Sequence, residues 1–266
     1  MTPFQPQEYS CLPLPGLHQH LASSGVVYPK WTSGSGGMIG GALSWEWEEE
    51  FARDPALSEL RHHLLRHGIK FVVFDMDLTV TARHTRGHLT RDPDTIASYL
   101  ASARATDALK TMKLCKALNL TIGVATFQRE VDDATHIGGS HLVRRVLGAI
   151  GAGDLVSDRD VVALSQTQYA EMIRDQETYN KNDLIRVLFE RRGIPYTPGS
   201  TLLIDDTRRN VESFVRIGGH GLLVEGGQGL KLQLAKVMEP GCIFVPGMSF
   251  AVHHAAPAYP PPSGYY

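Results

Sequence analysis

The chain has 266 residues, of which 42% are hydrophobic and 20% are charged. This composition is typical of a globular protein with a substantial core, and it argues against a fibrous or wholly disordered chain. The formal net charge is −2, from 26 basic and 28 acidic residues, and no dense block of Lys or Arg occurs. We therefore expect neither a nucleic acid nor a membrane surface as a partner.

Several features predict a cytoplasmic protein. The three cysteines, Cys11, Cys115 and Cys242, are widely spaced and odd in number, which favours reduced thiols. The first residues lack the basic start and the continuous apolar stretch of a secretory signal. No apolar run approaches the roughly 18 residues needed to cross a bilayer.

Composition divides the chain into three parts. Residues 1–48 form an N-terminal extension that we expect to be partly irregular, and 241–266 form a Pro/Tyr-rich tail that we expect to be disordered. The Gly-rich run at 33–41 follows no strand, so we interpret it as a flexible connector rather than a phosphate loop. The folded domain is predicted over 49–240.

The leucines between Asp54 and Gly68 share one helical face, which predicts the first helix. Asp54-Pro55 favours a helix start and Gly68 a helix end. A buried strand follows at once, at 71–74. Two further helical stretches are expected at 94–103 and 107–118.

Short apolar runs and amphipathic stretches then alternate to the end of the domain. This alternation predicts an α/β fold, a Rossmann-like three-layer sandwich with a central parallel sheet of about five strands. Ligands bind such sheets at the carboxyl ends of the strands. The five predicted strands lie at 71–74, 121–125, 161–164, 202–204 and 222–224, with helices before Gly193 and Gly218 among the elements that separate them.

The first strand ends in Phe74-Asp75-Met76-Asp77-Leu78-Thr79. Residues two apart on an extended chain share a face, so Asp75 and Asp77 can converge on one small site. Two carboxylates there repel each other unless a cation or a proton lies between them. Asp also favours turns that end strands, which is the alternative interpretation of this segment.

Three further strand or helix ends carry polar groups. Thr126 ends the strand at 121–125, Lys181 stands near the start of a helix, and Asp205-Asp206 ends the strand at 202–204. These four motifs, in this order, resemble those of the haloacid dehalogenase superfamily, whose first motif is an apolar strand ending in Asp-x-Asp-x-Thr. The resemblance covers about 69–224.

The resemblance implies a Mg²⁺-dependent phosphatase with an HAD-like fold. Asp75 would be the nucleophile that forms an aspartyl-phosphate, and Asp77 would be the general acid and base. Thr126 and Lys181 would hold the phosphoryl oxygens. A departure from the family is Phe127, which stands where relatives often carry a small or polar residue.

The metal set that the resemblance implies comprises Asp75, Met76 through its backbone carbonyl, Asp77, Asp205 and Asp206. Physical reasoning also favours a cation here. Bringing a phosphate charge to about 3.5 Å from a carboxylate costs roughly 5 kcal/mol at an effective dielectric near 20. Mg²⁺ prefers carboxylate, carbonyl and water oxygens, which are the groups these residues offer.

Substrate choice in this family comes largely from inserted cap domains. Neither the interval from Asp75 to Thr126 nor that from Thr126 to Lys181 leaves room for a large one, so we expect little or no cap. The loop at 81–90 would then shape the site. It contains Arg83, His84, Arg86 and His88, which suit a second anionic group on the substrate or belong to an ordinary polar surface loop.

The sequence leaves the substrate open between a small phosphate ester and a phosphoprotein, and it does not predict an oligomeric state. A catalytically weak regulatory or scaffold protein, or a phosphotransferase using the same intermediate, are the alternatives. Two histidine pairs, His62-His63 and His253-His254, are interpreted as solvated side chains rather than metal ligands.

Overall fold

The computed structural model describes residues 53–165 and 181–240. These residues all belong to Leu43–Tyr266, one of two units into which the chain divides. Within them, no helix combines the length and the apolar character needed to cross a bilayer. Several predictions lie outside the described residues, namely those for the extension 1–48, the tail 241–266, Cys11, Cys242 and the pair His253-His254.

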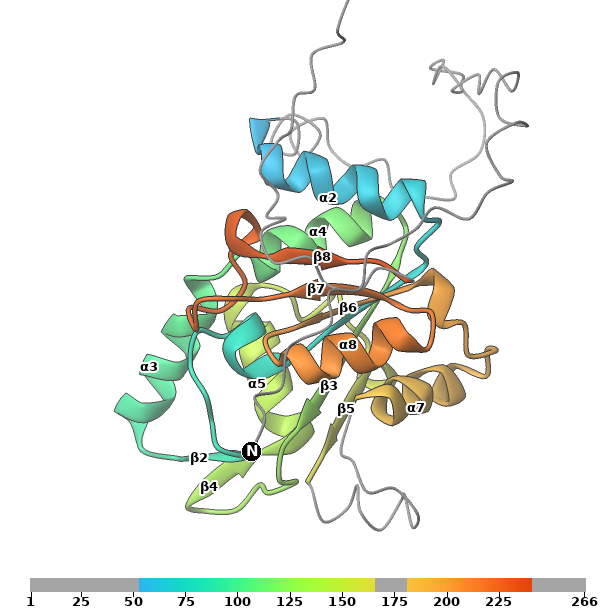
Figure 1. The fold of residues 1–266 in the computed structure, drawn as a ribbon. Helices are drawn as coiled ribbons and strands as arrows, with labels where there is room; N and C mark the ends of the chain where they lie inside the picture. The colour runs from blue at the N-terminus through green and yellow to red at the C-terminus, as the bar shows by residue number, and fades with distance from the viewer. Residues whose placement is uncertain (1–52, 166–180, 241–266) are drawn as a thin grey trace, which may run out of the picture. The chain divides into compact units, whose positions relative to one another are not determined.

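A six-stranded sheet forms the centre of the domain, in the order β5-β3-β1-β6-β7-β8 (Figure 1). Neighbouring strands are parallel from β5 to β7, which confirms the predicted parallel sheet, and β8 pairs antiparallel with β7 at one edge. The sequence did not indicate β8, because three residues are too few to show a period. The strands are β1 (Phe71–Phe74), β3 (Thr121–Phe127), β5 (Val161–Leu164), β6 (Thr201–Asp205), β7 (His220–Leu223) and β8 (Lys236–Met238).

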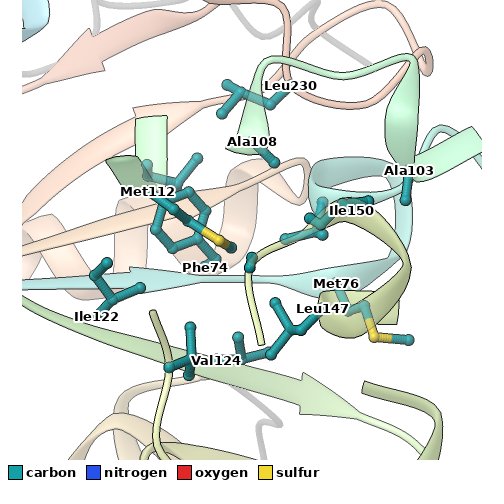
Figure 2. Close-up of a cluster of buried hydrophobic side chains, with 14 of the residues drawn as sticks. Phe74, Met76, Ala103, Ala108, Met112, Ile122, Val124, Leu147, Ile150 and Leu230 are labelled. Atoms are coloured by element: carbon teal, nitrogen blue, oxygen red, sulfur yellow. The ribbon is translucent and has the colours of Figure 1, made fainter. Parts of the chain in front are cut away.

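Helices pack on both faces of this sheet. Successive strand residues point to opposite faces, so Val72 and Phe74 of β1 belong to one hydrophobic core while Phe71 and Val73 belong to the other. The first core is covered by α2 (Pro55–Arg66), α3 (Pro93–Arg104), α4 (Ala108–Ala117) and α5 (Gly139–Ile150), and the second by α7 (Asn182–Arg192) and α8 (Arg208–Arg216). Figure 2 shows part of the first core, with Phe74, Ile122 and Val124 of the sheet near Met112, Leu147 and Ile150.

Local sequence signals set the helix ends as predicted. Asp54 caps α2, where its carboxylate accepts hydrogen bonds from the amides of Ala56 at 3.1 Å and Leu57 at 3.3 Å. Gly193 ends α7 in the left-handed region, with a φ of 64°, which a residue with a Cβ adopts only at a cost. On α4, Cys115 is a buried free thiol whose pKa is raised by burial to about 12.

Short elements tie together the loops at the carboxyl ends of the strands. The turn η1 (Met76–Val80) follows β1 directly, and a separate two-stranded antiparallel sheet joins β2 (His88–Thr90) to β4 (His136–Gly138). The loop after β1 is thereby fixed to the loop after β3. The other short elements are the 3-10 turns η2 (Asp158–Asp160), η3 (Pro198–Ser200) and η4 (Leu232–Leu234).

The two intervals in which a cap domain would be inserted contain ordinary elements of the fold. Residues 81–120 hold β2, α3 and α4, and residues 128–165 hold β4, α5 and β5. The described residues of these intervals include no separate domain. Residues 166–180 of the second interval are outside the described part of the chain.

Candidate functional site

The carboxyl ends of three neighbouring strands bring four predicted residues together. Asp75 follows β1, which lies between β3 and β6, and Thr126 and Asp205 stand at the ends of these two flanking strands. Lys181 is the residue immediately before α7. A cavity of about 980 Å³ opens at this edge of the sheet, and its lining includes Asp75, Thr126, Lys181 and Asp206.

A buried ammonium group links two of the carboxylates. The Nζ of Lys181 donates a hydrogen bond to Oδ1 of Asp75 and lies 2.9 Å from Oδ2 of Asp205. The Lys181 side chain is only 2% exposed. Asn210, in the first turn of α8, donates from its amide nitrogen to both oxygens of Asp205, at 3.2 Å and 3.1 Å. Two carboxylates thus share one cation, which leaves a negative charge in excess.

The protonation equilibria reflect this excess charge. Burial raises the pKa of Asp75 well above its usual range; Lys181 opposes this shift and Asp205 adds to it. Burial alone would lower the pKa of Lys181, but Asp205 and Asp75 outweigh it and raise that pKa. The pKa of Asp206 is also raised, first by burial and then by Asp205. A proton or a metal cation at Asp75 therefore lowers the energy of the site.

Three carboxylates are close enough to share a metal ion. Asp75, Asp205 and Asp206 each offer one oxygen, and these oxygens lie within 4.8 Å of one another. A donor set made only of carboxylate oxygens suits a hard cation such as Mg²⁺. The acidic cluster predicted from the sequence is therefore present, and its donors fit the predicted metal.

The other two members of the predicted metal set are engaged elsewhere. The carbonyl oxygen of Met76 accepts a hydrogen bond from the Thr81 amide at 3.0 Å and lies 3.2 Å from the Thr81 hydroxyl. These contacts occupy it within the turn η1. The carboxylate of Asp77 is not part of the three-carboxylate group.

Asp77 instead has its own buried set of donors at the edge of the cavity. Its Oδ2 accepts hydrogen bonds from the amide of Thr85 at 2.9 Å and from the Thr85 hydroxyl at 2.6 Å, and its Oδ1 accepts one from the Tyr99 hydroxyl at 2.6 Å. The Nδ1 of His84 lies 2.8 Å from Oδ2. The turn η1 makes this possible, because Leu78 takes a left-handed φ of 56° and reverses the chain after Asp77.

The loop at 81–90 divides into two pairs of residues. His84 and Arg86 line the cavity, as expected for residues that contact a substrate. Arg83 and His88 are not among the lining residues. The guanidinium of Arg83 donates to the Ser98 hydroxyl on α3, and the ring of His88 packs 4.8 Å from that of His136 where β2 pairs with β4.

Several lining residues were not predicted from the sequence. Arg129 follows β3 and Arg209 lies in the first turn of α8, and both face the cavity together with Arg86. None of these three arginines makes an ion pair with another residue of the described ranges. Arg129 and Arg209 both follow strands, and this position could have marked them as candidate site residues. Arg is so common on protein surfaces that the position alone did not identify them. Phe127, the departure from the family pattern, also lines the cavity.

The fold and this site define an α/β protein with a mostly parallel sheet and an acidic cluster that could hold a metal. No protein-family model matches the chain, and no curated protein matches it. A similar solved structure is that of DsGPDH of Dunaliella salina, with 14% identity and a TM-score of 0.35 over 58% of this chain. The match spans 23% of that protein, and so low a TM-score carries no argument about function.

The raised pKa of Asp75 predicts how stability changes with pH. The folded protein holds this proton more tightly than the unfolded chain, so the stability from this group falls as pH rises above the ordinary Asp pKa of about 4. In the presence of EDTA, the stability of Asp75→Asn relative to the wild type should rise as pH increases from 4.5 to 7.5, because only the wild type has to give up this proton. Urea unfolding of both proteins measures the difference. A difference that stays constant across this range would contradict the assigned shift.

Proposed function

We propose that the chain is a Mg²⁺-dependent phosphohydrolase of the haloacid dehalogenase type that hydrolyses a phosphate monoester through an aspartyl-phosphate on Asp75. The observation that carries the proposal is the buried contact of Lys181 with both Asp75 and Asp205 at the edge of one cavity. The residues come from three separate motifs, and their contact supports the proposal because it puts a cationic donor beside the carboxylate that would attack the phosphate. The assignment to the haloacid dehalogenase type itself rests on the four motifs and their order in the sequence.

The residues supply the charge balance that such a transfer needs. Asp75, Asp205 and Asp206 would hold Mg²⁺, which supplies positive charge against the phosphoryl oxygens when it is bound. Lys181 adds a second positive charge within reach of the Asp75 carboxylate. Asn210 keeps both oxygens of Asp205 oriented. Attack by a carboxylate on a phosphate dianion is otherwise opposed by like-charge repulsion.

The proposed reaction has two displacements. An oxygen of Asp75 forms a bond to phosphorus as the bond from phosphorus to the ester oxygen breaks, and Asp77 gives a proton to that leaving oxygen. Asp77 then takes a proton from a water molecule, whose oxygen displaces Asp75 and releases inorganic phosphate. Thr126 and Lys181 would hold the phosphoryl oxygens through both steps. The hydrogen bonds from Thr85 and Tyr99 hold Asp77 in place for this exchange.

The cavity favours a substrate with more negative charge than one phosphate carries. Arg86, Arg129 and Arg209 line it without acidic partners among the described residues. Arg presents a planar fork of donors that matches carboxylate and phosphate groups, so these three side chains suit a second anionic group. Both a small polyanionic ester and an acidic phosphopeptide have this chemistry.

Turnover of phosphate esters tests the proposal directly. The wild type should hydrolyse p-nitrophenyl phosphate or phosphopeptides with Mg²⁺ and lose that activity in EDTA. Asp75→Asn should abolish turnover, because the amide is isosteric but a poor nucleophile. Acid-quenched wild type should carry phosphate on Asp75, as measured by mass spectrometry. Absence of turnover on every ester and peptide by a folded wild type would favour the regulatory or scaffold alternative.

Asp77→Asn should slow turnover by about 10²–10⁴, the usual contribution of general acid–base catalysis. Alkyl phosphates need the proton and should lose most, while p-nitrophenyl phosphate should lose less in its first step and accumulate the aspartyl-phosphate. Steady-state kinetics and acid quench measure both effects. Tyr99→Phe, which removes one hydrogen bond but keeps the carboxylate, is the control and should lose less. An equal loss on all substrates would assign Asp77 a positioning role.

The loop at 81–90 offers a matched pair of variants, one at a residue that lines the cavity and one at a residue that does not. Arg86→Ala removes a cavity side chain and should lower kcat/KM about 10–100-fold for an ester with a second carboxylate, as expected for one lost charged hydrogen bond of about 1.5–3 kcal/mol. Its effect on p-nitrophenyl phosphate should be small. Arg83→Ala, in the same loop but bound to Ser98, should leave both substrates nearly unchanged. Equal effects of the two variants would show that the loop acts structurally.

A further inference from the structure

A second cluster of metal-ligating side chains lies at the opposite end of the sheet from the candidate active site. His63 and His67 occupy the last turn and the C-cap of α2, His220 is the first residue of β7, and Glu239 directly follows β8. Since β8 runs antiparallel to β7, with Met238 paired to Gly221, Glu239 comes back beside the amino end of β7. Asp75 and Asp205 stand at the carboxyl ends of the parallel strands.

The structure corrects the interpretation of His63 as a solvated residue. His63 is 9% exposed and His220 is 5% exposed, while the neighbouring His62 is exposed. The reason is the helical period, which turns position 63 toward the core and position 62 toward solvent. The rings of His63, His67 and His220 pack together, with centroids 4.6 Å, 5.4 Å and 4.7 Å apart.

This cluster has polar atoms without partners. The Nε2 atom of His63 and the Nδ1 atom of His220 are buried and make no hydrogen bond, while Nε2 of His67 faces Oε1 of Glu239. A buried polar atom left unsatisfied costs about 1–3 kcal/mol. Two such nitrogens in one group of packed rings show that the cluster does not satisfy its own imidazoles.

Distances within the cluster match a tetrahedral metal. Oε1 of Glu239 lies 3.0 Å from Nε2 of His67 and 3.6 Å from Nδ1 of His63. Zn²⁺ with bonds of roughly 2.0–2.1 Å holds tetrahedral ligand atoms about 3.3–3.4 Å apart, between these two values. One donor atom from each of the three residues lies within 4.8 Å of the others. Histidines four positions apart on a helix share a face and form a common metal pair.

We propose that His63, His67 and Glu239 bind one Zn²⁺ ion, or a divalent cation of similar preference, beside the packed ring of His220. Imidazole nitrogens with one carboxylate select such borderline cations over Mg²⁺ and Ca²⁺, which take oxygen ligands.

The position of the site defines its role. Its ligands come from α2 and from the residue after β8, elements far apart in the sequence. A cation held there fastens the edge strand β8 to α2. The site lies at the opposite end of the sheet from the candidate active site, so its role is structural rather than catalytic. Its ligands differ in chemistry from the carboxylates of the candidate active site, so each end of the sheet takes a different cation.

The test uses the full chain, freed of metal with EDTA and returned to excess Mg²⁺ so that the acidic cluster is filled. Zn²⁺ is titrated by calorimetry, Tm is followed, and Co²⁺ is used as a spectroscopic probe. The wild type should bind one equivalent of Zn²⁺, gain Tm with rising Zn²⁺, and give the intense visible bands of tetrahedral Co²⁺. His67→Asn and Glu239→Gln should each lose at least about tenfold in affinity.

His62→Asn is the matched control, because this histidine is the neighbour of His63 on the same helix but faces solvent. It should bind Zn²⁺ like the wild type. Glu239 is 38% exposed, so Glu239→Gln should keep the metal-free Tm near that of the wild type and report on binding alone. No stoichiometric binding by the wild type, or binding that survives both His67→Asn and Glu239→Gln, would overturn the proposal.

Discussion

The candidate site depends on the buried ammonium group of Lys181 and its contacts with Asp75 and Asp205. A buried charge is costly unless it is paired, and removing one partner of such a group typically costs about 3–5 kcal/mol. Here two carboxylates share one ammonium group, so one negative charge has no positive partner. The remaining negative charge creates the demand for a cation at the carboxyl ends of the strands. The proposed chemistry follows from that demand, because the cation that satisfies the carboxylates also neutralises a phosphate.

Asp77 is kept apart from this charged group by local structure. Only one residue separates it from Asp75, yet the left-handed Leu78 and the turn η1 place its carboxylate among the hydroxyls of Thr85 and Tyr99. This carboxylate lies outside the three-carboxylate group, and the proposed function assigns the proton exchange to it. The pairing of β2 with β4 supports this arrangement, since it fixes the loop that carries Thr85.

The two ends of the sheet differ in donor chemistry, and the difference follows from topology. The carboxyl ends of parallel strands lie at the same end of the sheet. There Asp75 and Asp205 offer oxygen donors, which suit a hard cation. The antiparallel strand β8 runs back toward the opposite end of the parallel strands and brings Glu239 beside His63 and His67. One strand of reversed direction thus brings the residue after β8 beside the end of α2.

The sequence by itself determined the five parallel strands and the order of the residues that follow them. Asp75, Thr126 and Asp205 each end an apolar run, and parallel strands must place such ends together, so local pattern was sufficient. Only the tertiary structure decided the partners of Asp77, the division of the 81–90 loop, the edge strand β8 and the histidine cluster. These depend on contacts between residues far apart in the chain and on elements of three residues, such as β2, β4 and β8, which are too short for a hydrophobic period to appear. Which of His62 and His63 is buried could likewise be decided only once the surface against which the helix packs was known.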